Sequence, residues 1–216
     1  EISNKVGVLM SETVKITSGS VEPSVVIYND NVGTIEVDKN NWPYVDKYEG
    51  WNKTGIGSES VTYTGENASV RNSGLANTDA YAGASGPNIV FFGKTPTSFN
   101  VNKITLSSGQ KNLQLTFGAS RSVNNNGTYD NTFDVSKFEV ALSADGTTWA
   151  PITYTKNNGD ADYPYWVFAT ANFTLKQVPE NLYIRFTALD ASAIRLDDIT
   201  SVSYTHLRAH ETTLHL

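Results

Sequence analysis

Apolar and polar residues alternate in many short runs of this chain, a pattern that predicts an all-β protein, a two-sheet antiparallel β-sandwich of the jelly-roll type. Each run is bounded by Gly, Asn, Ser or Pro, as expected for strands with one face on a core and the other in water. No stretch keeps a helical period between two capping signals. Two packed sheets are required, because a single open sheet would leave its apolar face in water.

The expected strands can be placed in order along the chain. Residues 25–28 form the first apolar run, and the last run contains Ile194 and Leu196. The alternating apolar positions between them are Phe99, Val101, Ile104 and Leu106; Leu113, Leu115 and Phe117; Phe138, Val140 and Leu142; and Leu182, Ile184, Phe186 and Ala188. These side chains form the expected core, because successive residues of a strand point to opposite faces.

Two connections carry turn signals. Asp145 and Gly146 predict a tight hairpin between the strand that ends at Leu142 and a strand through Ile152, because glycine adopts positive backbone angles without strain. Residues 121–134 form a longer polar loop that joins two further core strands. Long polar loops at the end of a sandwich commonly bind ligands.

The chain divides into three predicted parts, of which residues 24–201 form the sandwich. Residues 1–23 are interpreted as the end of a preceding β domain or a linker, or alternatively as an extra strand pair of the same sandwich. Residues 202–216 contain all 3 histidines, and their order resembles a translated sequencing-library adapter, which predicts a non-native tail and a metagenomic source. The alternative for the tail is a genuine amphipathic C-terminal helix.

Composition excludes several classes of function. Residues 1–201 contain neither histidine nor cysteine, which excludes Ser-His-Asp triads, Cys-His pairs, histidine-ligated zinc and thiol redox chemistry there. With 16 Lys and Arg, 22 Asp and Glu, a net charge of -6 and no basic cluster, the chain is not expected to bind nucleic acid. No apolar run is long enough to cross a bilayer. The abundance of Asn, Thr, Ser, Gly and Tyr is typical of an exported bacterial protein.

Two groups of aromatic residues lie outside the alternating runs. The first contains Trp42, Tyr44, Tyr48 and Trp51, and the second contains Tyr163, Tyr165 and Trp166. Exposed rings of this kind are covered either by the protein's own loops or by a ligand with a matching apolar face, such as a sugar. The predicted ligand-binding residues are the rings Trp42, Tyr48, Trp51, Tyr165 and Trp166, with the loop amides Asn124, Asn125 and Asn126.

Carboxylates and an amide at two strand ends predict a structural calcium site. Asp197 and Asp198 follow the last apolar run, and Asn29 and Asp30 end the first one. The first and last strands of an antiparallel sandwich often lie side by side, which would bring these oxygens together as ligands for a hard cation. The alternative is a set of turn caps with a salt bridge to an arginine.

A resemblance to a known family rests on a series of short segments. They are residues 48–51 (Tyr-Glu-Gly-Trp), Gly55 and Gly57, residues 61–63, 68–71, 81–86, 113–118 and 143–149, and residues 194–199 (Ile-Arg-Leu-Asp-Asp-Ile). Over residues 24–201 the chain resembles Bacteroidetes surface lipoproteins with galactose-binding-like jelly-roll modules. This resemblance implies a module of a larger chain that is extracellular or at the outer-membrane surface and is lipid-anchored in the full-length protein, and an acid in the last strand that helps to hold a cation.

Together these features predict a non-catalytic, monomeric cell-surface carbohydrate-binding or adhesion module whose partner is a polysaccharide or other glycan. Jelly-roll glycosidases place three acids at alternating positions of one strand, whereas Glu36 and Asp38 supply only two and Glu139 stands alone. The alternatives are a glycan-active hydrolase or lyase and a structural spacer domain. Two carboxyl groups about 5 to 9 Å apart in an aromatic-lined cleft would favour hydrolysis.

Overall fold

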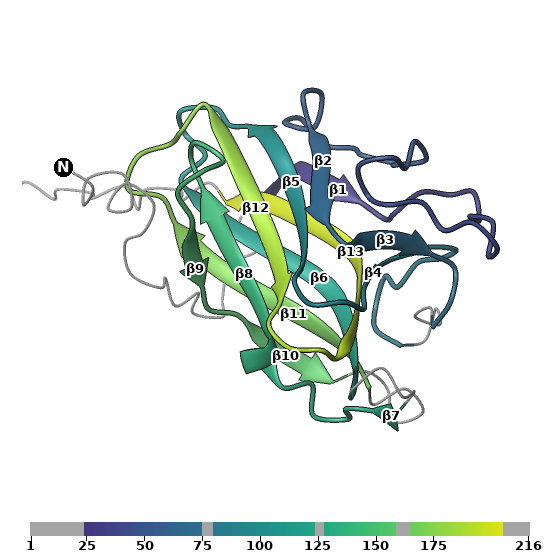
Figure 1. Cartoon of the computed structure of the whole chain (residues 1–216). Helices are drawn as coiled ribbons and strands as arrows, with labels where there is room; N and C mark the ends of the chain where they lie inside the picture. Colours follow the sequence, from purple (N-terminus) through teal and green to yellow (C-terminus); the bar gives the residue numbers. More distant parts are fainter. Residues whose placement is uncertain (1–23, 75–79, 124–127, 159–164, 205–216) are drawn as a thin grey trace, which may run out of the picture.

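Two antiparallel sheets make up the protein in the computed structural model, which describes residues 24–74, 80–123, 128–158 and 165–204 (Figure 1). The larger sheet has 8 strands in the order β10-β11-β6-β13-β4-β3, with β1 paired to β13 and β7 paired to β6. The smaller sheet has 5 strands in the order β2-β5-β12-β8-β9. The only helical element among the described residues is the short 3-10 turn η1, Val135–Lys137. The predicted all-β sandwich is therefore confirmed.

The strands of the larger sheet are β1 (Ser24–Asp30), β3 (Ala68–Arg71), β4 (Ile89–Phe92), β6 (Asn112–Val123), β7 (Thr128–Tyr129), β10 (Thr155–Asn158), β11 (Trp166–Thr174) and β13 (Ala193–Tyr204). The strands of the smaller sheet are β2 (Thr62–Glu66), β5 (Thr97–Thr105), β8 (Phe138–Ser143), β9 (Ala150–Ile152) and β12 (Asn181–Ala188).

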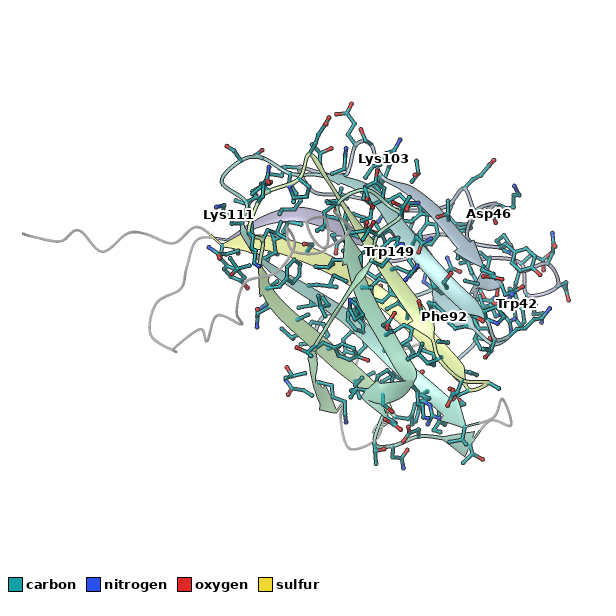
Figure 2. The ribbon with its side chains drawn as sticks, turned by 60° about the vertical axis from the view of Figure 1, so that its left-hand side comes forward. Trp42, Asp46, Phe92, Lys103, Lys111 and Trp149 are labelled. Atoms are coloured by element: carbon teal, nitrogen blue, oxygen red, sulfur yellow. The ribbon has the colours of Figure 1, made fainter. Side chains whose placement is uncertain are left out.

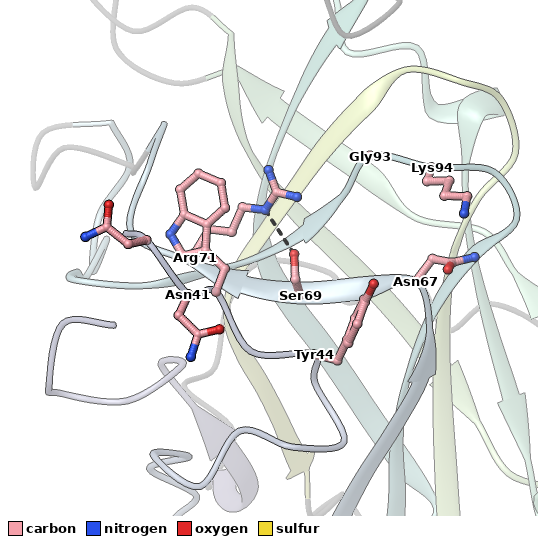
Figure 3. A pocket seen from close by; sticks show the side chains of 9 residues that line it. Asn41, Tyr44, Asn67, Ser69, Arg71, Gly93 and Lys94 are labelled. Carbon is pink, nitrogen blue, oxygen red and sulfur yellow. Dashed lines mark hydrogen bonds between the residues drawn. The ribbon is translucent and has the colours of Figure 1, made fainter. Parts of the chain in front are cut away.

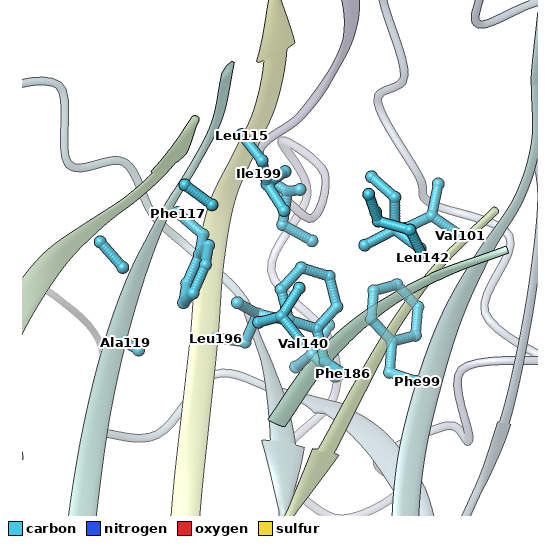
Figure 4. Close-up of a cluster of buried hydrophobic side chains, with 14 of the residues drawn as sticks. Phe99, Val101, Leu115, Phe117, Ala119, Val140, Leu142, Phe186, Leu196 and Ile199 are labelled. Carbon is cyan, nitrogen blue, oxygen red and sulfur yellow. The ribbon is translucent and has the colours of Figure 1, made fainter. Parts of the chain in front are cut away.

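The core lies between the sheets and consists of the side chains that alternate in the sequence (Figure 4). Phe117 of the larger sheet meets Phe186 of the smaller one edge to face, with 5.2 Å between the ring centroids. The alternation slips once in β5, where Val101 and Ile104 both face the core. A β-bulge causes the slip, because Lys103 takes a φ of 63° and the pairing with β12 shifts there.

The predicted hairpin and the predicted neighbourhood of the first and last strands are both confirmed. β8 pairs with β9 across the turn at Gly146, whose φ is 74°, and the Asp145 carboxylate accepts hydrogen bonds from the N–H groups of Thr147 and Thr148. β1 pairs with β13 from Ser24 to Asp30. The termini of the sandwich are thus held in its larger sheet.

Strand β13 extends past residue 201, where the predicted sandwich ends. The strand continues to Tyr204, and Ser203 is buried while the Tyr204 hydroxyl hydrogen-bonds the Gln114 side chain at 2.8 Å. The main-chain ladder with β1 and β6 holds residues 202–204 whatever their side chains, since backbone hydrogen bonds do not depend on residue type. Residues 1–23 and 205–216, which include the rest of the predicted tail, lie outside the described residues.

Candidate functional site

A groove of about 360 Å³ opens beside the edge strand β3 (Figure 3). Three separate segments contribute to it: the loop before Val45, strand β3 with the residue that precedes it, and the turn after β4. Its lining residues are Asn40, Asn41, Trp42, Tyr44, Asn67, Ser69, Arg71, Gly93 and Lys94. Aromatic rings, amides, a hydroxyl and two cations therefore meet in one hollow, and no carboxylate lines it.

Backbone hydrogen bonds fix the loop of the groove against β3. The Val45 N–H donates to the Ala68 carbonyl at 3.1 Å, and the Val70 N–H donates to the Pro43 carbonyl at 2.8 Å. Tyr44 lies between these bonds as the bridge partner of Ser69. The loop thus covers the edge of the larger sheet at β3 and is bonded to it through backbone hydrogen bonds, as an additional strand would be.

Alternation along β3 decides which side chains reach the groove. Ala68 and Val70 are buried in the core, so Ser69 and Arg71 project from the opposite face of the strand. The Arg71 Nε donates a hydrogen bond to the Ser69 hydroxyl at 2.9 Å. Both side chains therefore approach the groove from a rigid strand.

Arg71 lies between two aromatic rings. Its guanidinium carbon is 4.4 Å from the centroid of Trp42 and 3.7 Å from the centroid of Phe91, the residue on β4 opposite Ser69. The Trp42 Nε1–H donates to the Asn72 side-chain oxygen at 3.0 Å, which fixes the edge of the indole. Contact with two rings orients the guanidinium and stabilises its charge.

Several groove side chains remain accessible. The Tyr44 side chain is 58% exposed, an unusually high value for a large ring, and Asn40, Asn41 and Lys94 are exposed as well. Figure 3 shows Arg71 and Lys94 toward opposite ends of the groove, with Ser69 between them. An accessible ring beside amides and hydroxyls offers both an apolar surface and hydrogen bonds.

The cations of the groove have no acidic partner among the described residues. No ion pair within 4.0 Å involves Arg71 or Lys94 in that part of the chain. Burial lowers the pKa of Arg71, and the charge of nearby Arg195 on β13 lowers it further. Arg195 lies on the other side of Phe91, with 5.5 Å between its guanidinium carbon and the ring centroid.

Of the predicted ligand-binding rings, only Trp42 lies in the groove. Trp51 stacks on Tyr63 with 3.9 Å between centroids and meets Tyr48 edge to face at 5.2 Å. The Tyr48 hydroxyl donates to the Val32 carbonyl at 3.0 Å. Both rings pack against the main core, so their contacts are with the protein itself.

The second predicted aromatic group is divided between the interior and the surface. Trp166 is fully buried with Tyr81, Ala80 and Ile89, which corrects its prediction as a ligand-binding ring, because no face of the indole reaches solvent. Tyr165 is half-buried and stacks on Tyr129 with 3.8 Å between centroids. Asn124, Asn125 and Asn126 lie outside the described residues, and their binding role stays a prediction.

Trp166 is buried because it begins strand β11, whereas the sequence pattern assigns it to a loop. The signal was present, since Val167, Ala169, Ala171 and Phe173 alternate and all face the core. Tyr44, Ser69, Arg71 and Lys94 were not predicted as site residues. Their positions in the sequence carry no shared period, so only the pairing of distant segments brings them together.

The predicted calcium ligands are divided between two environments. The Asp30 carboxylate accepts hydrogen bonds from the Tyr63 hydroxyl at 2.5 Å and from the Val32 N–H at 2.7 Å. Asp197 is fully buried, and its Oδ2 has no hydrogen-bond partner. Burial raises the pKa of Asp197 well above its ordinary value, and the charges of Asp198 and Asp30 raise it further.

Asp198 and Asn29 are occupied elsewhere. The Asp198 carboxylate accepts from the Tyr81 hydroxyl at 2.6 Å and from the Ser85 hydroxyl at 2.5 Å. The Asn29 side-chain oxygen accepts from the Thr200 hydroxyl at 2.7 Å. A β-bulge in β13, where Asp198 has a φ of 50°, directs the side chains of Asp197 and Asp198 into different surroundings.

In the described part of the chain, no three His, Cys, Asp or Glu residues come together in a way that could hold a metal ion. The charges of Asp198 and Asp30 both act on Asp197, whose unpartnered Oδ2 is a buried oxygen that a cation would satisfy. Calcium binding stays a prediction. Among the described segments, no helix is long and apolar enough to cross a bilayer.

Neither a protein-family model nor a curated protein matches the chain. Among solved structures, a xylan-binding domain from Paenibacillus barcinonensis is similar with a TM-score of 0.44 and 10% identity, over 87% of this chain and 99% of that domain. A carbohydrate-binding module solved with β-1,4-galactotriose gives a TM-score of 0.37 and 12% identity, over 66% and 88% of the two chains. An adhesin domain of Lys-gingipain from Porphyromonas gingivalis gives 0.37 and 11%, over 68% and 92%. These likenesses assign no role to any residue of this chain.

Proposed function

We propose that the groove beside β3 binds a polysaccharide, and that the protein is a non-catalytic carbohydrate-binding or adhesion module. The observation that carries this proposal is the accessible Tyr44 ring beside the oriented Trp42–Arg71 pair, within one groove that also presents amide side chains. A sugar ring has an apolar face that packs on an aromatic ring, and hydroxyls that need planar amide or charged partners.

The expected binding is weak. An aromatic contact contributes on the order of 1 kcal/mol beyond the area that it buries. The groove is open and offers few rings, so affinity depends on one or two side chains. Multiple copies on a surface, or neighbouring modules in a larger chain, would raise the avidity.

The lining of the groove supports binding rather than hydrolysis. Glycoside hydrolysis uses a pair of carboxyl groups that flank the scissile bond, and the groove lining contains none. Glu36 approaches only indirectly, since its carboxylate accepts a hydrogen bond from Asn72 at 2.6 Å. A lyase would need a base placed at the sugar ring. A reducing-end assay measures turnover of the polysaccharide directly.

The proposed location is the outer surface of a Bacteroidetes cell, where the full-length protein would be lipid-anchored. The composition and the resemblance of residues 24–201 to surface lipoproteins support this location. Externally added protease should degrade the protein in intact cells that produce the full-length chain. Protection until the cells are lysed would contradict a surface location.

Trp42→Ala and Tyr44→Ala test the proposed function, and Trp149→Ala is the matched control. Trp149 also carries an arginine on its face, with the Arg185 guanidinium carbon 4.3 Å from its centroid, but it lies elsewhere on the molecule (Figure 2). We expect Trp42→Ala and Tyr44→Ala each to weaken binding by about tenfold or more, because a stacking face is lost. Trp149→Ala should bind as the unchanged protein does.

The measurement is retention on immobilised polysaccharides, combined with circular dichroism to confirm folding and a reducing-end assay for turnover. Trp51→Ala is a further variant to measure. Because Trp51 stacks on Tyr63 and not in the groove, its loss should lower the stability of the protein, while folded Trp51→Ala protein should still bind the polysaccharide. Equal binding by all variants, binding to no polysaccharide, or release of shorter products would each contradict the proposal.

A further inference from the structure

We infer that the saccharide bound in the groove is acidic, with carboxylate or sulfate groups that Arg71 and Lys94 bind. This inference rests on the proposed function, because it names the class of glycan that the same groove takes. It starts from the charge of the lining, which contains two cations and no acid although the chain carries 22 acidic and 16 basic residues.

Elsewhere in the described residues, three basic side chains lie within 4.0 Å of an acid, those of Arg121, Lys47 and Lys137. Arg121 pairs with Asp130 and Asp190 at 2.7 and 3.0 Å, and Lys47 pairs with Asp46 at 3.2 Å. The groove differs from these sites because its lining brings two cations together with no acid, in a molecule with a net charge of -6. A partly buried cation such as Arg71 is costly to leave without a counter-charge, so an anion from outside would complete the site.

The frame around Arg71 leaves the binding end of its guanidinium available. Trp42 and Phe91 both contact the guanidinium, and its Nε–H donates a hydrogen bond to the Ser69 hydroxyl. The two terminal nitrogens have no hydrogen-bond partner among the described residues. A planar guanidinium held in this way can donate two parallel hydrogen bonds to a carboxylate or sulfate.

The potential on this face of the sheet strengthens the attraction. Arg195 on β13 is the pairing partner of Phe91 on β4, and its positive charge helps to lower the pKa of Arg71. Lys94 contributes a third positive charge from the turn after β4. Partial burial of Arg71 strengthens its interaction with an anion, because there is less water between the charges.

A saccharide fits this groove better than other polyanions. Asn40, Asn41 and Asn67 supply amides for sugar hydroxyls beside the cations, and Tyr44 supplies a ring face. The net charge of -6 opposes the long-range attraction on which nucleic-acid binding depends. Local contacts in the groove must therefore select the ligand.

The test is an array that carries acidic polysaccharides beside their neutral forms. Polygalacturonate stands beside its carboxyl-reduced form, and dextran sulfate stands beside dextran, so that the array separates carboxylate from sulfate. Single-stranded DNA is included as an unrelated polyanion. Lys94→Gln removes one charge from an exposed side chain. Lys111→Gln is the matched control, because Lys111 is also exposed and lies far from Trp42 of the groove (Figure 2).

We expect retained glycans to be acidic, and their affinity to fall by about tenfold or more in the neutral form and in Arg71→Gln. Lys94→Gln should weaken binding by roughly threefold, as for an exposed ion pair. Lys111→Gln should have no effect, and added salt should weaken binding.

Retention of neutral glycans alone, or equal affinity for acidic and neutral forms, would overturn this inference and leave the proposed function intact. Equal binding of DNA would also overturn it, since the surface would then be a general polyanion site. Binding of no glycan at all would overturn the proposed function itself. If Arg71→Gln fails to fold, Lys94→Gln and the neutral glycan forms still decide the matter.

Discussion

Two arginines of the larger sheet, Arg121 and Arg71, have opposite surroundings. Arg121 on β6 uses Nη1 for Asp130, Nη2 for Asp190 and Nε for Ser192, with distances of 2.7, 3.0 and 3.1 Å. Arg71 on β3 has aromatic rings on its faces and a single hydrogen bond to a serine. Arg121 is therefore a structural cation whose N–H groups donate to neighbouring acids and a serine. Arg71 is held in place by its neighbours, but no acid neutralises its charge.

Replacement of Arg121 should produce the largest change. Arg121→Gln leaves Asp130 and Asp190 without their cation, so we expect a loss of about 2–3 kcal/mol in the free energy of unfolding, less than for a fully buried pair because Asp190 is partly exposed. Arg71→Gln should cost less than about 1 kcal/mol, since no charge loses its partner. Urea unfolding measures both variants. Equal losses would remove the distinction between the two arginines.

The pH dependence of stability should show the same contrast. Burial alone would raise the pKa of Asp130, but hydrogen bonds from Thr132, Asp134 and Arg121 together hold it well below its ordinary value. The pKa of Asp190 is also lowered, by Ser192 and Arg121 against the effect of burial. A depressed acid pKa stabilises the folded state above the unfolded value of about 3.9, and this contribution is lost as the pH falls toward the folded pKa.

The stability difference between the unchanged protein and Arg121→Gln should therefore narrow as the pH falls below about 4. Urea unfolding at a series of pH values measures this difference, and Arg71→Gln serves as the control with a difference that stays constant. A gap that stays constant or widens in acid would show that the ion pairs do not provide the stability.

The smallest expected effect concerns Asp197, an acidic counterpart of Arg71 because its Oδ2 is buried without a partner. If calcium binds between Asp197 and Asp30, added calcium should raise the melting temperature by a few degrees and a chelator should reverse the shift, since a ligand of the folded state stabilises it by mass action. Asp197→Asn should abolish the response. Identical melting curves with calcium and with chelator would contradict the calcium prediction.

Much of the fold was predictable because alternation is a local property. The core positions of β5, β6, β8 and β12 and the β8–β9 turn all follow from the sequence. β11 is not among the strands predicted from the sequence, although apolar and polar residues alternate from Val167 to Phe173, because the aromatic residues before them are assigned to a loop. The candidate site was predicted less well, since only Trp42 among the predicted rings lies in the groove.

By itself, the sequence determined the fold class, most of the core strands and the absence of histidine and cysteine chemistry from residues 1–201, because period, turn residues and composition need no knowledge of distant contacts. The tertiary structure decided which rings are accessible. Trp42 and Trp51 come from one short segment, yet pairing of Tyr44 with Ser69 places the first beside a groove, while stacking on Tyr63 places the second against the core. Similarly, the β-bulge in β13 directs the Asp198 carboxylate to the Tyr81 hydroxyl and leaves Asp197 in a different, buried environment. Such outcomes depend on pairing between segments far apart in the chain, which a local pattern does not encode.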